Sequence, residues 1–303
     1  MLSSFAMNPE STPSAATRAA PLDTHSFPVA GHADSLLPNG RSFRLAWADE
    51  FDGTELDETK WAYRLSMMQK WHPAWTDKGV HLDGKGHCVF TLIEEDGRPV
   101  SSQLQTGFNF MDQPQEKTTF GHDHLQWPIG RLHESKFLHG PGYWECRCRL
   151  QQKPGWWSAF WIQSPVIGSS LDSRESGTEI DVMESFKPNV VWPHFIHWGG
   201  YGLDHQHADV GGSTEHEVAE SADGGHWHRF GVLWDTTGYT FYVDGREDGR
   251  IEGKGISLRP EFVLISTEPQ GYRHENHEPT PEARAAIGDT FLVDYVRVFD
   301  IVD

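Results

Sequence analysis

From residue 41 to the last residue, short apolar or alternating runs are separated by Gly, Pro, Asp and Asn. This pattern predicts β-strands joined by turns. Helix signals occur in 280–286, with Thr280 as N-cap, Pro281 at the first helical position and Gly288 beyond the end. The clearest predicted strands are 87–94, 143–151, 158–163, 178–185, 226–235, 237–246, 262–268 and 291–300.

Many strands, few helices and no internal repeat predict an all-β fold, a two-sheet antiparallel sandwich of the jelly-roll kind. Residues 1–38 are rich in Ser, Ala, Thr and Pro and have few large apolar groups, so we expect a disordered or loosely packed tail. Residues 39–303 are expected to form one domain.

The charge balance limits the partners. With 25 Lys and Arg against 44 Asp and Glu, the net charge is −19, which repels phosphate backbones and anionic membranes. No run of about 18 apolar residues predicts a membrane span. We therefore expect no nucleic acid and no membrane as partner, and a monomer.

The aromatic and cysteine content fits a large β core. The chain has 13 Trp, which can fill a core or stack on sugar rings, and composition alone favours the core. Of the three cysteines, Cys146 and Cys148 are two apart on a predicted strand and share a face with Trp144 and Leu150. Neighbours at this spacing do not bridge readily, so buried free thiols are expected.

The stretch Glu179 to Ser185, EIDVMES, concentrates acidic chemistry in a predicted strand. Glu179 and Asp181 are two apart and project from one face, but Glu184 is three further on and would face the other way. A β-bulge absorbs one extra residue, and we assign Met183 as that residue, which returns Glu184 to the face of the other two acids.

Three carboxylates on one face can be a solvated surface, but close like charges are costly. Retaining glycoside hydrolysis needs two carboxyl groups about 5 Å apart, one as nucleophile and one as acid and then base. Two long Glu side chains on a bent sheet could reach that separation. Asp181 between them can share a proton or hydrogen bond with Glu179, so the cluster should titrate as a unit.

These residues resemble the bulged signature of glycoside hydrolase family 16. The ordered blocks 47–61, 130–151, 155–163, 228–246 and 291–300 also resemble that family, so the likeness spans about residues 41 to 303. It implies a concanavalin-like β-jelly roll with a concave substrate cleft and retaining endo-glycosidase activity. Position by position, it implies Glu179 as nucleophile, Asp181 as assisting acid and Glu184 as acid/base.

The resemblance also suggests how substrate is held. Trp157 and Trp161 share one strand face, and the family places an aromatic residue at Trp161 beside the catalytic strand, whereas core packing is an equal alternative for Trp157. His197 falls where the next strand is expected and either touches the acid/base or substrate or is a structural hydrogen bonder. Trp198 is a weaker candidate. Arg147 and Arg149 share a face with Glu145 and could make the cleft locally basic for sulfated chains.

No cofactor is required for this chemistry, but the family resemblance suggests a structural calcium at Glu50, Gly86 and Asp294, with ordinary solvated acids as the alternative. The His pairs at 122–124 and 205–207 lack the context of a zinc site, and we interpret them as surface loops.

The leading hypothesis is an endo-glycosidase acting on internal β-glycosidic bonds of a polysaccharide. A glycan-binding sandwich without catalysis and a transglycosylase with the same residues are the alternatives. The resemblance implies a secreted or periplasmic protein, although residues 1–21 show no basic segment followed by an apolar one. The Trp-Pro-x-x-Gly run and Asn-rich strand usual in β-1,3-glucanases are missing, which favours a galactan such as agar, porphyran or carrageenan, or another β-glycan.

Overall fold

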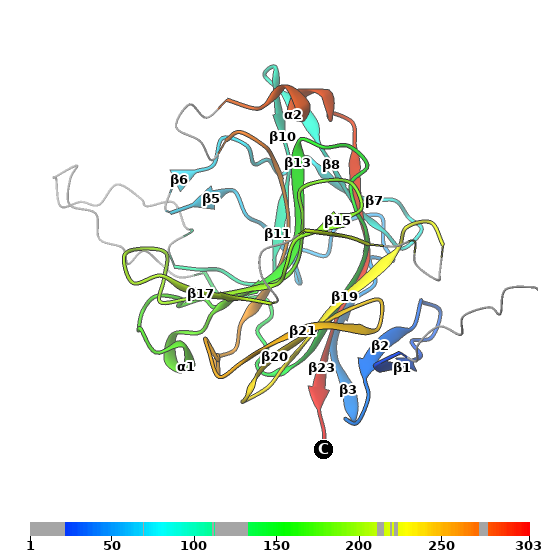
Figure 1. Ribbon diagram of the computed structural model, residues 1–303. Coiled ribbons are helices and arrows are strands. Elements are labelled where there is room, and N and C mark those ends of the chain that lie inside the picture. The colour runs from blue at the N-terminus through cyan, green and yellow to red at the C-terminus, as the bar shows by residue number, and fades with distance from the viewer. Residues whose placement is uncertain are drawn as a thin grey trace, which may run out of the picture.

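The computed structural model describes residues 22–68, 70–110, 112, 133–210, 215–218, 220, 224–272 and 278–303. In these ranges two antiparallel sheets pack face to face, as the sequence predicts, and the paired strands all run antiparallel (Figure 1). The seven-stranded sheet contains, in spatial order, β17 (Gln206–Asp209), β16 (Phe195–Trp198), β14 (Glu179–Ser185), β13 (Trp156–Gln163), β22 (Phe262–Pro269), β11 (Gln103–Gln105) and β4 (Ala62–Tyr63).

The second sheet has eight strands and packs against the first through a shared apolar core. Its path is β21 (Arg246–Glu252), β20 (Gly238–Val243), β19 (His228–Trp234), β12 (Gly142–Arg149), β23 (Thr290–Ile301), β8 (Cys88–Thr91) and β7 (Val80–Leu82), and β3 (Phe43–Asp49) pairs with β23. The eight strands predicted from sequence all appear, with 87–94 divided between β8 and β9.

Short elements complete the described fold. Thr280 caps α2 by accepting the amide hydrogen of Ala283, as predicted, because an N-cap side chain satisfies a donor that the first turn leaves unpaired. The helices are α1 (Ser173–Ser176) and α2 (Pro281–Ala285). The two-stranded pairs are β1 (Thr24–Phe27) with β2 (Ser35–Pro38), β5 (Ser66–Met67) with β6 (Lys70–Trp71), β9 (Ile93–Glu95) with β10 (Arg98–Val100), and β15 (Val190–Val191) with β18 (His216–Glu217).

The core between the sheets contains one face of each central strand. Cys146 and Cys148 of β12 are fully buried there with Trp144, as predicted, and face Phe160 of β13 and Ile180 of β14. Because these inner positions are apolar, the opposite face of the seven-stranded sheet is the one left for polar chemistry. Among the described residues, no helix has the length and apolar character needed to cross a bilayer.

The prediction of a tail over 1–38 is wrong for its last third. Residues 24–38 form the β1–β2 hairpin, which lies against the outer side of the eight-stranded sheet near β3 (Figure 1). Leu37 is fully buried against Tyr143 and Phe299, and the Leu36 amide donates to the Glu145 carboxylate at 3.0 Å. The hairpin was missed because polar contacts to the sheet hold much of it.

Candidate active site

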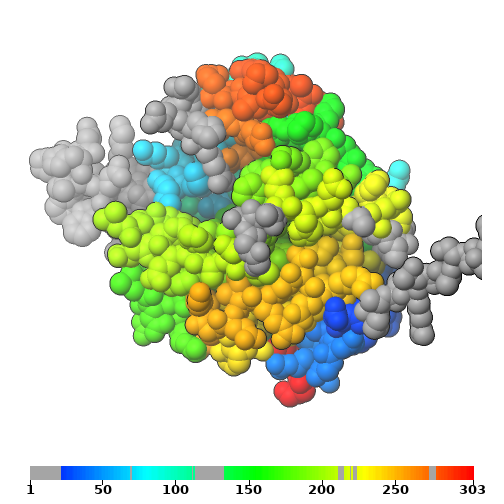
Figure 2. All heavy atoms as spheres, viewed as in Figure 1, coloured from blue at the N-terminus to red at the C-terminus, as the bar shows by residue number. Residues whose placement is uncertain are grey.

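A cavity of about 380 Å³ opens on the outer face of the seven-stranded sheet. In Figure 2 the cyan β5–β6 hairpin and the yellow-green residues around β17 lie on either side of this region. The cavity contains all three predicted acids and two predicted tryptophans, and it is lined by Arg64, Met67, Met68, Trp75, Asp112, Trp157, Trp161, Gln163, Glu179, Asp181, Glu184, His197, Tyr201 and His205.

The acids share this cavity because β14 contains a bulge. Asp181 is paired with Trp161 and Met183 with Phe160, so Val182 has no partner on β13. Pairing then continues with Glu184 opposite Ala159, on the same face as Trp161. The predicted bulge is confirmed, but its unpaired residue is Val182 and not Met183. Both side chains are buried and apolar, so sequence could not distinguish them.

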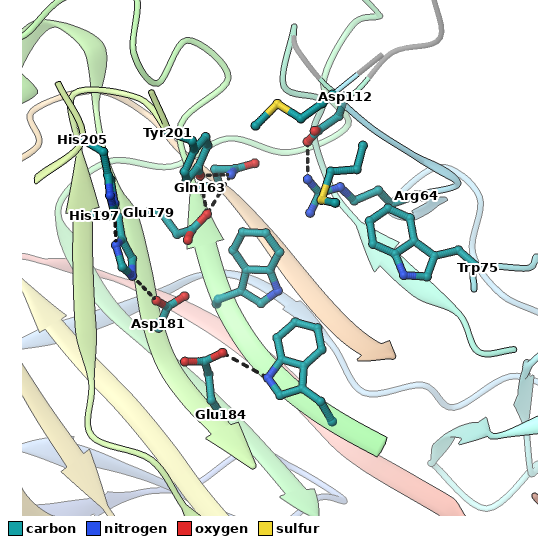
Figure 3. Close-up of a pocket in the computed structure, with 14 residues that line it drawn as sticks. Arg64, Trp75, Asp112, Gln163, Glu179, Asp181, Glu184, His197, Tyr201 and His205 are labelled. Atoms are coloured by element: carbon teal, nitrogen blue, oxygen red, sulfur yellow. Dashed lines mark hydrogen bonds and ion pairs between the residues drawn. The ribbon is translucent and has the colours of Figure 1, made fainter. Parts of the chain in front are cut away.

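Glu179 is held by two donors from neighbouring segments. The Tyr201 hydroxyl donates to Oε2 of Glu179, and Nε2 of Gln163 donates to the same oxygen at 2.9 Å (Figure 3). Burial, and then the negative charge of Asp181, raise the pKa of Glu179 to about 7, although His197 and Tyr201 act in the opposite direction. Glu179 thus needs a higher pH to ionise than an exposed glutamate does.

His197 on β16 joins Asp181 to a second histidine. Its Nε2 lies 3.2 Å from Oδ2 of Asp181, and its Nδ1 lies 2.9 Å from Nε2 of His205. Burial opposes a charge on His197, but the hydrogen bond and charge of Asp181 outweigh it and raise its pKa to about 9. Burial and the nearby His197 lower the pKa of His205. At neutral pH His197 is thus an imidazolium that donates to both neighbours, and it contacts Asp181 rather than Glu184.

Both predicted tryptophans line the cavity, and a hydrogen bond holds the indole N–H of each. Trp157 donates its indole N–H to Oε1 of Glu184 at 3.0 Å, and Trp161 donates to Oγ of Ser266 at 2.8 Å. Trp157 also packs in an apolar cluster with Ala159 and Trp161 and is only 8% exposed, so it both lines the cavity and is buried. Indoles fixed in this way give the rigid apolar surfaces on which sugar rings stack.

Sequence reasoning missed the far wall of the cavity. The Arg64 guanidinium lies 5.2 Å from the ring centre of Trp161 and 5.4 Å from that of Trp75, and it forms a buried ion pair with Asp112. No periodic signal connects Arg64 with Asp112. Gln163 could have been found, since it lies two residues beyond Trp161 on the same strand face.

Three predicted substrate contacts are wrong. Glu145 and Arg147 lie on β12, in the sheet opposite the cavity, where Glu145 accepts hydrogen bonds from Leu36 and Tyr295. Trp198 packs against the core, and a methyl group added at Gly255 would lie 2.6 Å from its ring. Alternation identifies residues that share a face, but it does not identify the sheet or the side.

The residues expected to bind calcium do not fit that ion. Glu50 uses both carboxylate oxygens on Arg297, at 2.8 and 2.7 Å, and the Asp294 carboxylate binds Arg147 at 2.7 Å. Calcium needs several oxygen ligands, and these two carboxylates already neutralise arginines. Of the histidine pairs, 122–124 lies outside the described residues, whereas His205 is exposed just before β17, as the surface-loop interpretation predicts, and it also contacts His197 at the cavity.

Comparison with known proteins identifies the protein family. The chain is 26% identical over 272 residues to the glucan endo-1,3-beta-glucosidase A1 of Niallia circulans, covering 84% of this chain and 37% of that protein. It is 28% identical over 159 residues to a beta-agarase of Phocaeicola plebeius, covering 43% and 48%. The chain thus spans less than half the length of these relatives.

Solved structures share the fold. A non-specific endo-beta-1,3(4)-glucanase of family GH16 aligns with a TM-score of 0.59 at 20% identity, covering 93% of this chain and 97% of that one. The catalytic domain of a laminarinase from Thermotoga petrophila gives 0.58 at 19%, covering 87% and 100%. The chain thus resembles these enzymes in fold and has a cavity lined by acids on the outer face of one sheet. The chain belongs to the glycosyl hydrolases family 16, whose sequence model matches residues 69–254, more than half of it.

Proposed function

We propose that the protein is a retaining endo-β-glycosidase that works by double displacement. The observation that carries this proposal is the bulge at Val182, which puts Glu179 and Glu184 on one cavity face with Asp181 between them. Two carboxyl groups on one side of a sugar-sized cavity are what a covalent glycosyl-enzyme mechanism requires.

In this mechanism Glu179 attacks the anomeric carbon while Glu184 protonates the leaving glycosidic oxygen. Tyr201 and Gln163 both donate to Oε2 of Glu179, so Oε1 is the oxygen that attacks. Glu184, by then a carboxylate, removes a proton from water, and this water releases the sugar from Glu179 with its configuration retained. His197, whose pKa is raised to about 9, binds Asp181 beside the nucleophile.

For the substrate we propose an uncharged polymeric β-glucan with 1,3-linkages. We further propose that the enzyme is a monomer and meets this substrate outside the cytoplasm. The relative that covers most of the chain is a glucan endo-1,3-β-glucosidase, and the acidic net charge disfavours sulfated chains. A β-galactan such as agar is the second candidate, because a β-agarase also matches and the Trp-Pro-x-x-Gly run of β-1,3-glucanases is absent.

The test is reducing-sugar release from laminarin, lichenan, agarose and porphyran by the wild type, Glu179→Gln and Glu184→Gln. We expect laminarin to be cleaved and both variants to lose about 10³-fold or more in activity. NMR of the first product should show retained configuration. An active Glu179→Gln variant would exclude the proposed nucleophile, inversion would exclude the mechanism, and transfer to glycan acceptors in place of water would identify a transglycosylase.

A further inference from the structure

The bulge residue Val182 lacks a strand partner on both sides. It is unpaired on β13, and on the other side the ladder between β14 and β16 ends at Asp181 opposite Phe195. The next position on that strand edge is His194, which follows Pro193, a residue without a backbone N–H. The ladder with β16 therefore ends beside the carbonyl of Val182, which needs a donor because it is buried.

His194 supplies that donor from its side chain. Nδ1 of His194 lies 2.8 Å from the Val182 carbonyl oxygen, and Nε2 lies 3.1 Å from Oδ2 of Asp248. A carbonyl oxygen can only accept, so Nδ1 is the donor in the hydrogen bond to Val182. The ring is 2% exposed and stacks on Phe241 at 4.3 Å between ring centres, with 4° between the planes.

Asp248 occupies a bulge of its own, in the opposite sheet. On β21, Glu247 is paired with Tyr242 and Gly249 with Phe241, so Asp248 has no partner on β20. The second charged group facing this carboxylate is His216 of β18, with Nε2 at 3.7 Å. His194 thus connects Val182, the unpaired residue of β14, with Asp248, the unpaired residue of β21 in the opposite sheet.

We propose that His194 is a positioning residue that keeps the catalytic strand in its bulged register and thereby keeps Glu184 in the cavity. Without a donor for the Val182 carbonyl, the competing arrangement is a regular strand, which would turn Met183 to the cavity and Glu184 to the core. This inference rests on the proposed role of Glu184 as acid/base. It gives a role to a residue that lines no part of the cavity.

Two near-isosteric variants separate the hydrogen bond to Val182 from the one to Asp248. In His194→Asn the amide nitrogen sits where Nδ1 was and still donates to Val182, whereas in His194→Gln it sits near Nε2 and reaches only Asp248. We expect His194→Asn to keep kcat/KM on the polysaccharide within a few-fold, and His194→Gln to lose about 100-fold, as misplacement of a catalytic group does. Asp248→Asn keeps an acceptor for Nε2 and should remain active.

The leaving group provides a readout that a general loss of stability would not change. A dinitrophenyl glycoside of the released oligosaccharide leaves without protonation, so its kcat/KM does not need a correctly placed acid. We therefore expect His194→Gln to impair polysaccharide cleavage far more than cleavage of the aryl glycoside, with KM little changed. Thermal unfolding should remain cooperative in both variants.

Equal activity of His194→Gln and His194→Asn on the polysaccharide would overturn the proposal, as would equal losses of His194→Gln on both substrates. If His194→Gln does not fold, His194→Asn still decides, because an inactive but folded Asn variant contradicts the role of the Val182 hydrogen bond. The Glu184→Gln variant, measured in parallel, separates a failure of the proposed function from a failure of the His194 proposal. If Glu184→Gln stays active on the polysaccharide, the proposed function fails. If Glu184→Gln is inactive but His194→Gln is active, only the positioning role of His194 is wrong.

Discussion

The Tyr201 hydroxyl, in the loop after β16, donates a hydrogen bond to Glu179 on β14. A hydrogen bond to a carboxylate favours its ionised form and so works against burial, which raises the pKa of Glu179 to about 7. In the proposed mechanism the ionised form of Glu179 is the one that attacks. The loop after β16 therefore contributes to setting the pH at which the enzyme becomes active.

Tyr201→Phe should move the acid limb of the kcat/KM profile to higher pH. Loss of the donor destabilises the carboxylate, so activity should fall more at pH 6 than at pH 8, by about tenfold for each pH unit that the limb moves. The limb reports the ionisation of Glu179. Tyr63→Phe, outside the cavity on β4, is the matched control, and a limb that stays in place or moves down would contradict the prediction.

His197→Asn should reduce activity and change the pH dependence of stability. Since the pKa of His197 is raised from 6.5 to about 9, its contribution to stability is complete below about pH 6.5 and is lost as pH rises through about 9. The free-energy difference between wild type and variant should therefore shrink between these values. Urea unfolding at several pH values measures it, and a difference that grows with pH would exclude the assigned charge.

Glu261→Gln should stabilise the protein at alkaline pH. Burial raises the pKa of Glu261 to about 8, so the folded state keeps a proton that the unfolded chain loses near 4.5. Stability contributed by this group falls as pH rises between those values, by about 1.4 kcal/mol per pH unit.

Gln at position 261 keeps an acceptor for the Thr178 amide, which lies 2.8 Å from Oε1 of Glu261, and removes the titration. Unfolding free energies of variant and wild type should be similar at pH 5 and diverge by pH 9. Glu94→Gln, on the exposed β9 strand, is the control. A wild type that is as stable as Glu261→Gln at pH 9 would show that Glu261 ionises without penalty.

Deletion of Val182 should abolish activity. One residue fewer removes the bulge and restores strict alternation, which would point Glu184 toward the core and cost about 10² to 10⁴ in rate as the acid/base is lost. Val182→Ala keeps the residue count and should remain active with a lower melting temperature, because it removes buried methyl groups. Full activity in the deletion variant would show that the extra residue does not place Glu184.

The apolar pattern and the acidic signature were sufficient for the sandwich and for the three acids, because buried strands alternate and the bulge disturbs that alternation visibly. The same reasoning assigned Glu145 to the cleft, since alternation does not say that a hairpin covers the other face of β12. Tyr201 lies in a glycine-rich loop without periodicity, and Arg64 meets Asp112 only through the fold. Contacts made between distant segments leave no local pattern to detect.

The β1–β2 hairpin determines how this enzyme can be shortened for expression or fusion. Arg297, fully buried on β23, donates to the Ala33 carbonyl at 2.8 Å and to the Ser35 hydroxyl at 2.9 Å. A version beginning at residue 39 would remove both acceptors and leave a desolvated guanidinium with Glu50 as its partner. The Asp23 amide also donates to the Gly245 carbonyl at 3.0 Å. A shortened protein should therefore begin before residue 23.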